Sequence, residues 1–210
     1  MWGSLNIQIL PHRIPQLVGD SMQGTAIGAI VFVGLAVAII VQPVAGALSD
    51  RSRFRWGRRR PYMLAGLVAT IPFLIIIGLS ENYLLFFVAV IGLQIAANTA
   101  HGPYQGIIPD QVQPEARGRA SGFFGFANLF GTILGVLVAS IFLSQGMLWP
   151  AVIAIIVTLL ATSAVCWMFV PETPPETIRP FDGILTEARH RLQELRLHPA
   201  FVWLVVSRLF

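Results

Sequence analysis

Residues 120–171 read ASGFFGFANLFGTILGVLVASIFLSQGMLWPAVIAIIVTLLATSAVCWMFVP, a run of 52 residues without one Asp, Glu, Lys or Arg. A helix needs roughly 20 apolar residues to cross the hydrocarbon core of a bilayer, so this run holds two spans. Ser144-Gln145-Gly146 forms the polar break between them. Three earlier charge-free runs each hold one span: 21–49, 61–80 and 82–109. The sequence therefore predicts a polytopic membrane protein.

The composition of the whole chain supports this prediction. Of its 210 residues, 55% are hydrophobic and 11% are charged, and the mean hydropathy is +0.72. A soluble domain carries about 25% charged residues, so this chain could not cover its surface in water. The single Cys, Cys166, excludes a disulfide framework and a Cys-based metal site. Since the sequence shows no metal-ligand cluster, nucleophile motif or phosphate-binding loop, we expect neither an enzyme nor a cofactor.

The charge-free runs predict an all-α bundle over residues 1–171. Its spans are expected at about 25–48, 62–80, 83–108, 119–143 and 147–170. Residues 172–198 form a linker of soluble character, in which 183–198 reads as an amphipathic helix on the membrane face. A further span starts near Pro199 and occupies 199–210.

The placement of Arg predicts the orientation in the membrane. All fourteen basic residues are Arg, and the segments 47–61, 108–119 and 172–199 hold six, two and four of them. The alternate connections, 80–83 and 144–150, hold none. Basic loops stay on the cytoplasmic side, so we expect the Arg-rich loops there, in a multi-pass protein of the plasma or bacterial inner membrane. Their clustering in short loops argues against a nucleic-acid partner.

One Arg-rich loop carries a spaced motif: Gly46-x-x-x-Asp50-Arg51, then Gly57-Arg58-Arg59-Arg60. An acid at a helix C-terminus is unfavourable beside the negative end of the helix dipole. We therefore expect Asp50 to be stabilised by an Arg between 51 and 60, or by another helix N-terminus, in a charge latch that can close and open. Simple anchoring by positive charge is the alternative, but it does not explain the spacing before the Arg residues.

This motif resembles the signature that follows the second helix of the major facilitator superfamily. Val41-Gln42-Pro43, the insert 52–56 and Asn98-x-x-x-Gly102-Pro103 are similar to the branch of glycoside–pentoside–hexuronide:cation symporters and plant-type sucrose carriers. The resemblance implies that residues 25–170 are family helices two to six. The chain would then be the N-terminal half of a major-facilitator fold, incomplete at both ends, with helix one and helices seven to twelve largely missing.

A polar stripe follows one face of the 83–108 span: Gln94, Asn98, His101 and Gln105. Spacings of four, three and four residues place these side chains within about 60° of one another. Polar groups in lipid are costly, so the stripe must face protein or a wet cavity. Amide and imidazole groups suit a hydroxyl-rich ligand, and the resembled family lines its central cavity with this helix. Hydrogen bonding between helices is the alternative.

The coupling ion is less defined by the sequence. The resembled sucrose carriers have an Asp on this helix where Gln94 stands here, and no complete span of this chain contains a carboxylate. Proton coupling would then depend on His101, on the missing half, or not operate. Arg208 would lie roughly 13 Å into the last span if that span starts near Pro199. There it would bind a substrate oxygen or pair with a carboxylate, unless the helix starts later and Arg208 reaches the interface.

The resemblance implies a secondary active transporter that moves a small polar solute, a sugar or glycoside, by alternating access. Its expected partners are the solute, a coupling cation (H⁺ or Na⁺), the bilayer, and the missing helices of the same or another chain. The alternative is a truncated, non-transporting remnant, or a half-carrier that needs a partner chain.

Three local expectations complete the sequence reading. Pro11 and Pro15 should break a helix that ends near Leu10. The family resemblance further implies that Asp110 and Glu115, near Arg117 and Arg119, make cytoplasmic ion pairs that differ between inward- and outward-open states. The 119–143 span carries a small-residue face, which should pack closely against another helix, with cavity lining as the alternative. The face is made of Gly118, Gly122, Gly125, Gly131 and Gly135, with Asn128 and Thr132.

Overall fold

The computed structural model describes residues 9–52, 54 and 57–169. All of the described helices belong to one compact unit of the chain. The predicted amphipathic helix at 183–198, the span expected from Pro199 and the proposed site residue Arg208 lie outside the described residues.

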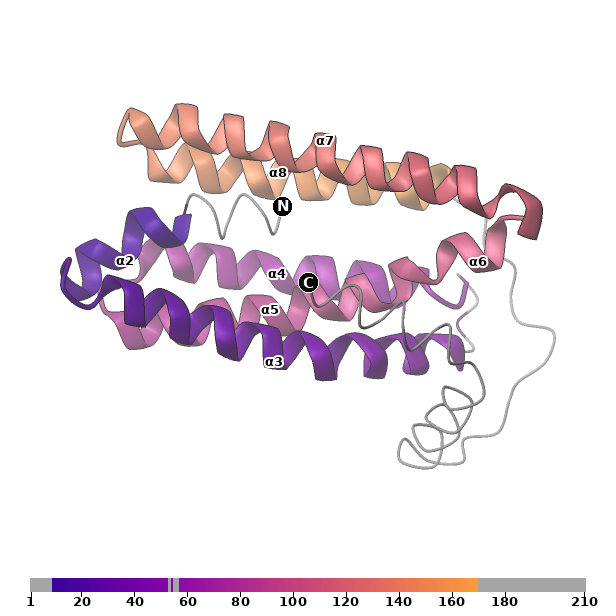
Figure 1. Ribbon diagram of the computed structural model, residues 1–210, viewed down its shortest axis with the longest axis horizontal. Helices are drawn as coiled ribbons and strands as arrows, with labels where there is room; N and C mark the ends of the chain where they lie inside the picture. Colours follow the sequence, from indigo (N-terminus) through magenta and orange to yellow (C-terminus); the bar gives the residue numbers. More distant parts are fainter. Residues whose placement is uncertain (1–8, 53, 55–56, 170–210) are drawn as a thin grey trace. The chain divides into compact units, whose positions relative to one another are not determined.

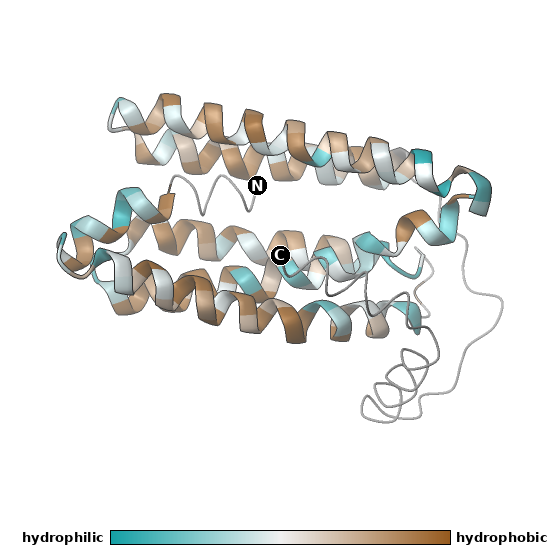
Figure 2. Cartoon of the chain, in the orientation of Figure 1, coloured by the Kyte–Doolittle hydropathy of each residue, from teal (hydrophilic) through white to brown (hydrophobic). Residues whose placement is uncertain are grey.

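Five long helices form the described part (Figure 1). They are α3 (Gln23–Asp50), α4 (Arg60–Leu79), α5 (Tyr83–Gln105), α7 (Arg117–Ser144) and α8 (Leu148–Phe169). Each is long and apolar enough to cross a membrane, and each lies where the sequence has a charge-free run. Figure 2 shows hydrophobic residues along the middle of these helices and hydrophilic residues near their ends. The described residues contain no strand, which confirms the predicted all-α membrane fold.

Three short helices complete the described part: α2 (Leu10–Val18), α6 (Ile107–Gln111) and the 3₁₀ turn η2 (Pro114–Ala116). For the described residues, the expectation that Pro11 and Pro15 interrupt helical structure is wrong, since α2 contains both. The helix expected before Leu10 falls mostly on residues 1–8, which lie outside the described residues. Pro11 lies in the first turn, where a backbone N–H has no helical partner to lose. Pro15 costs one hydrogen bond, and full burial of Leu10 and Ile14 compensates for it.

The core lies where α3, α4 and α5 pack side by side (Figure 1). Phe86 and Leu93 of α5 are fully buried there. Gly66 of α4 has no side chain, which lets the backbones of α4 and α5 approach each other closely. A Cβ placed on it would lie 2.6 Å from the backbone nitrogen of Ala100. Since backbone atoms cannot move aside as a flexible side chain can, the α4–α5 contact requires glycine at position 66.

α7 packs differently from the central helices. Only 11% of the most apolar 18-residue stretch of this span is buried, and large side chains such as Phe123 and Phe126 are exposed. A Cβ on four of its glycines would meet nothing within 4 Å: Gly118, Gly122, Gly125 and Gly131. The expected close packing at these four positions is therefore not found within the described part of the chain, because no atom of another helix comes within 4 Å of where their Cβ atoms would be.

Candidate functional site

A cluster of charged side chains gathers at the Arg-rich ends of the helices, and we call Asp50, Arg58, Arg59 and Asp110 the charge latch. Asp50 is the last residue of α3, Arg59 immediately precedes α4, and Asp110 lies in α6. Arg59 Nη2 is 2.9 Å from Asp50 Oδ1, and Arg59 Nε is 2.8 Å from Asp110 Oδ2. Arg58 pairs with the same Asp110 oxygen. The expectation that Asp50 finds its partner among Arg51 to Arg60 is confirmed.

Arg59 is the centre of the charge latch. Its side chain is only 9% exposed, and its Nη1 also donates to the backbone oxygen of Pro103 at 3.0 Å. The guanidinium lies where a side chain at position 106 would be, since a Cβ on Gly106 would come within 1.5 Å of Arg59 Nη1. One buried guanidinium therefore joins the ends of α3, α5 and α6.

The role of Asp110 differs from the expectation. It pairs with Arg58 and Arg59 across the latch, whereas Arg117 donates to the backbone oxygens of Val112 (3.1 Å) and Pro109 (2.8 Å). The reason is geometric: α6 directly follows α5, so Asp110 comes beside the start of α4. The signal in the sequence was an acid a few residues after Gly102-Pro103, on the same side of the membrane as the Arg cluster.

The remaining motif residues shape the loop and the helix crossing. Gly46 lies against α5, where a Cβ on it would be 3.8 Å from the backbone oxygen of Gly102. Gly57 has a φ of +106°, a conformation that is strained for any other residue. The backbone N–H of Arg51 donates to the oxygen of Leu48 and closes α3. Arg60 stacks on the Trp167 ring of α8, 5.5 Å from its centroid.

Two of the four residues of the polar stripe, Gln94 and Asn98, are buried between helices. Gln94 and Asn98 are each 6% exposed. Asn98 Nδ2 donates to Gln94 Oε1 (3.0 Å) and to the Gln94 backbone oxygen (2.7 Å), while its Oδ1 accepts from Gln42 Nε2 of α3 at 2.6 Å. Gln94 in turn fills the space over Gly34, where a Cβ would lie 2.5 Å from its Nε2. The bond from Gln42 to Asn98 joins α3 to α5, as the alternative of hydrogen bonding between helices has it, and Gln42 is a member that the stripe alone did not reveal.

The other two residues of the stripe, His101 and Gln105, are accessible. Gln105 Nε2 and His101 Nδ1 are 3.1 Å apart, in an exposed hydrogen bond. The Tyr104 ring lies between these two positions in sequence, with its centroid 6.1 Å from that of His101 and 5.0 Å from that of Phe124 on α7. The accessible amide and imidazole groups, beside an aromatic ring, can donate to and accept from hydroxyl groups. Within the described residues, no group of three or more His, Cys, Asp or Glu could hold a metal ion.

Comparison with known proteins gives consistent matches. The profile of the Major Facilitator Superfamily matches residues 5–210. The General alpha-glucoside permease of Schizosaccharomyces pombe is 30% identical over 149 residues, which cover 61% of this chain and 27% of that protein. An uncharacterized symporter of Synechocystis is 27% identical over 157 residues, covering 67% and 29%. The sucrose transport protein SUC3 of Arabidopsis thaliana is 32% identical over 124 residues, covering 49% and 21%. The match thus spans less than a third of each relative's own length.

Proposed function

This chain belongs to the Major Facilitator Superfamily, and from that membership we propose that it forms part of a secondary transporter for a sugar or glycoside. The membership confirms the resemblance drawn from the motifs, and with the five apolar helices it makes the chain a multi-pass membrane protein. The names of the relatives, an alpha-glucoside permease and a sucrose transport protein, favour a sugar as the solute. The family assignment also favours a carrier over an enzyme.

The solute, in this proposal, binds at the polar stripe of α5. The observation that carries the proposal is the accessible His101–Gln105 pair beside the Tyr104 ring, because sugars are bound by paired donors and acceptors and by aromatic faces. Gln94 and Asn98 support this surface from within, through their hydrogen bonds to each other and to α3. A coupling cation, H⁺ or Na⁺, accompanies the solute, and His101 is the candidate proton carrier on this helix.

The charge latch would control access to the stripe. Its ion pairs hold the Arg-rich ends of α3, α5 and α6 together, and we place these ends on the cytoplasmic side of the cell membrane by the positive-inside rule. Alternating access requires two states of the bundle, and the solute shifts their populations by binding one state more tightly. A closed latch stabilises one of these states, and its opening accompanies the other.

Direct sugar binding tests this proposal. The purified chain in liposomes is incubated with radiolabelled sucrose and with radiolabelled maltose, and saturable binding and uptake are measured separately. We expect binding that weakens about five-fold in His101→Ala and in Gln105→Ala, since a hydrogen bond contributes about 1 kcal/mol. The matched control is Thr99→Ala, because Thr99 donates only to Ile95 of its own helix.

Binding and uptake, measured separately, distinguish a complete carrier from a half-carrier. Binding with uptake supports a complete carrier. Binding without uptake supports a half-carrier that needs further helices from the same or another chain. Absence of saturable binding for both sugars would contradict the proposed solute class, and equal loss in Thr99→Ala would contradict the proposed site.

A further inference from the structure

The last turn of α5 carries the accessible pair of the polar stripe. His101 and Gln105 lie four residues apart, with Gln105 at the end of the helix, and their side chains meet at 3.1 Å. Pro103 lies between them. Because proline has no backbone N–H, the Thr99 oxygen receives no helical hydrogen bond from position 103, and the helix is weakened at this turn. The spacing of the two side chains therefore depends on what holds the chain on each side of Pro103.

The chain before Pro103, which carries His101, is fixed on α3. The Asn98 side chain accepts a hydrogen bond from Gln42 of α3 at 2.6 Å. Gly102 lies against the backbone of the same helix, where a Cβ would come within 2.4 Å of the Gln42 oxygen. A backbone contact this close leaves no room for a shift toward α3. His101 lies between these two contacts, so α3 determines its position.

The chain after Pro103, which carries Gln105, is held by the charge latch. The Pro103 oxygen accepts two hydrogen bonds, from the backbone N–H of Gly106 at 3.1 Å and from Arg59 Nη1 at 3.0 Å. The last four oxygens of a helix lack helical partners, and a cation at this end is stabilised by the helix dipole. Arg59 thus caps α5 at the turn that ends with Gln105. Its guanidinium also fills the space beside Gly106.

We propose that Arg59 is a positioning residue for the solute-binding pair. By holding the Pro103 oxygen, it keeps Gln105 within reach of His101, so opening of the latch weakens solute binding. This inference rests on the function proposed above, and it gives the binding site a direct regulator. The bond to Pro103 lies in the same helical turn as the pair, so no distant movement is needed to connect them. Since coupling between two sites is reciprocal, a bound solute stabilises the closed latch by the same factor.

The bond between the two side chains can be followed without a solute, by NMR of isotope-labelled histidine in micelles. In a chain whose other three histidines are replaced by Asn, His101 is the only imidazole. Gln105→Ala gives the reference Nδ1 signal of the unbonded ring. We expect Arg59→Gln to move the signal more than halfway to this reference, because the two sides of Pro103 are then held separately. Gly106→Ala should have the same effect, since its Cβ would displace the guanidinium.

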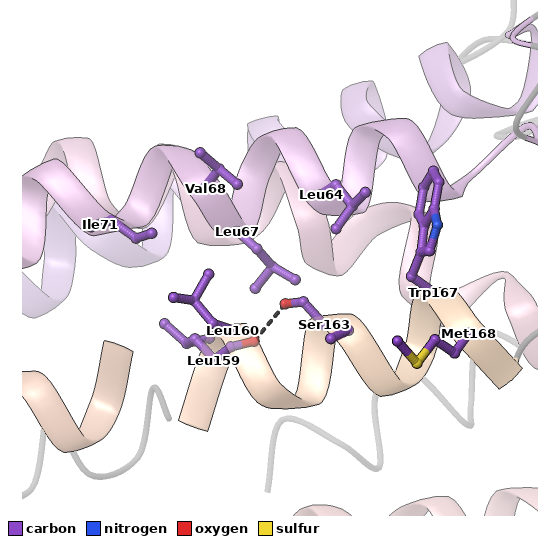
Figure 3. A pocket seen from close by; sticks show the side chains of 10 residues that line it. Leu64, Leu67, Val68, Ile71, Leu159, Leu160, Ser163, Trp167 and Met168 are labelled. Carbon is purple, nitrogen blue, oxygen red and sulfur yellow. Dashed lines mark hydrogen bonds between the residues drawn. The ribbon is translucent and has the colours of Figure 1, made fainter. Parts of the chain in front are cut away.

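Three control variants separate positioning from a general loss of stability. Asp50→Asn breaks one ion pair of the latch but leaves the bond to Pro103. Leu159→Ala weakens helix packing at the middle of α8, where Leu159 lines an apolar groove between α4 and α8 (Figure 3). Arg119→Gln removes an exposed Arg from the start of α7. All three should leave the Nδ1 signal unchanged, and a shift in them as large as that in Arg59→Gln would overturn the positioning role.

Sugar affinity gives a second measurement of the same link. Arg59→Gln should weaken sugar binding about five-fold, as Gln105→Ala does, because each variant costs one hydrogen bond to the solute. The double variant should lose no more than Gln105→Ala alone, since Arg59 acts through Gln105. Additive losses would mean that Arg59 affects solute binding by another route, and would contradict the proposal.

The positioning role and the solute class can fail independently. An unshifted Nδ1 signal in Arg59→Gln and in Gly106→Ala would overturn the positioning role, whether or not a sugar binds. A shifted signal without sugar binding would support the positioning role and contradict the proposed solute class. Far-UV circular dichroism verifies that each variant is helical, and Gly106→Ala decides the question if Arg59→Gln does not fold.

Discussion

Replacement of Arg59 by Gln should destabilise the chain by about 2.5 kcal/mol. The variant loses two ion pairs and one hydrogen bond to the Pro103 oxygen. The side chains of Asp50 and Asp110 are 41% and 33% exposed, so solvent screens the ion pairs, which then contribute about 0.5 kcal/mol each. The bond to Pro103 is buried and involves a charged donor, so its loss costs about 1.5 kcal/mol. Asp50→Asn should therefore cost much less, about 0.5 kcal/mol.

The assay is reversible unfolding in mixed micelles with increasing dodecyl sulfate, followed by far-UV circular dichroism. Arg119→Gln serves as the control for the loss of one Arg, and its midpoint should stay unchanged. Gly106→Ala gives an independent check, because its new Cβ would lie 1.5 Å from Arg59 Nη1 and would displace the guanidinium. Since both changes disrupt the same contacts, the double variant should lose little more than either single variant. A midpoint for Arg59→Gln equal to that of Arg119→Gln, or fully additive losses in the double variant, would refute this reasoning.

The same assay checks three further predictions. Gly66→Ala should cost about 2 kcal/mol, because its Cβ would meet backbone atoms of α5, whereas Gly122→Ala has open space and should be neutral or slightly stabilising; equal effects would contradict the packing argument. Gln42→Leu should cost about 1 kcal/mol through the lost hydrogen bond to Asn98, and an unchanged midpoint would show that this bond contributes nothing. Gly57→Ala should cost about 1 kcal/mol because its φ is +106°, and a stabilised variant would show that the turn adapts without strain.

The helices were predictable because one physical rule dominates in lipid. Charged side chains are expelled from the spans, so the run 120–171 already marks α7 and α8 with a break at 144–146. The rule is weaker outside the spans. Pro11 and Pro15 suggested a break, but burial of the short helix α2 against the core outweighs one missing hydrogen bond.

The partners within the site were less predictable than its location. The spacing of the motif identified Asp50 and the Arg cluster, but it could not show which guanidinium would be buried. That choice depends on α6, whose position brings Asp110 to Arg59 and leaves room at Gly106. Likewise, periodicity placed four polar residues on one face of α5. It could not show that Gln42 of α3 donates a hydrogen bond to Asn98. Of the four polar residues, His101 and Gln105 are the ones that stay accessible.

The three bonds of Arg59 have a consequence for the order of events at this end of the bundle. Since a single guanidinium holds Asp50, Asp110 and the Pro103 oxygen, its departure unties three helix ends at the same moment. The ends of α3, α5 and α6 are therefore coupled through one side chain, and release of its firmest contact, the buried bond to the Pro103 oxygen, favours release of the other two ends.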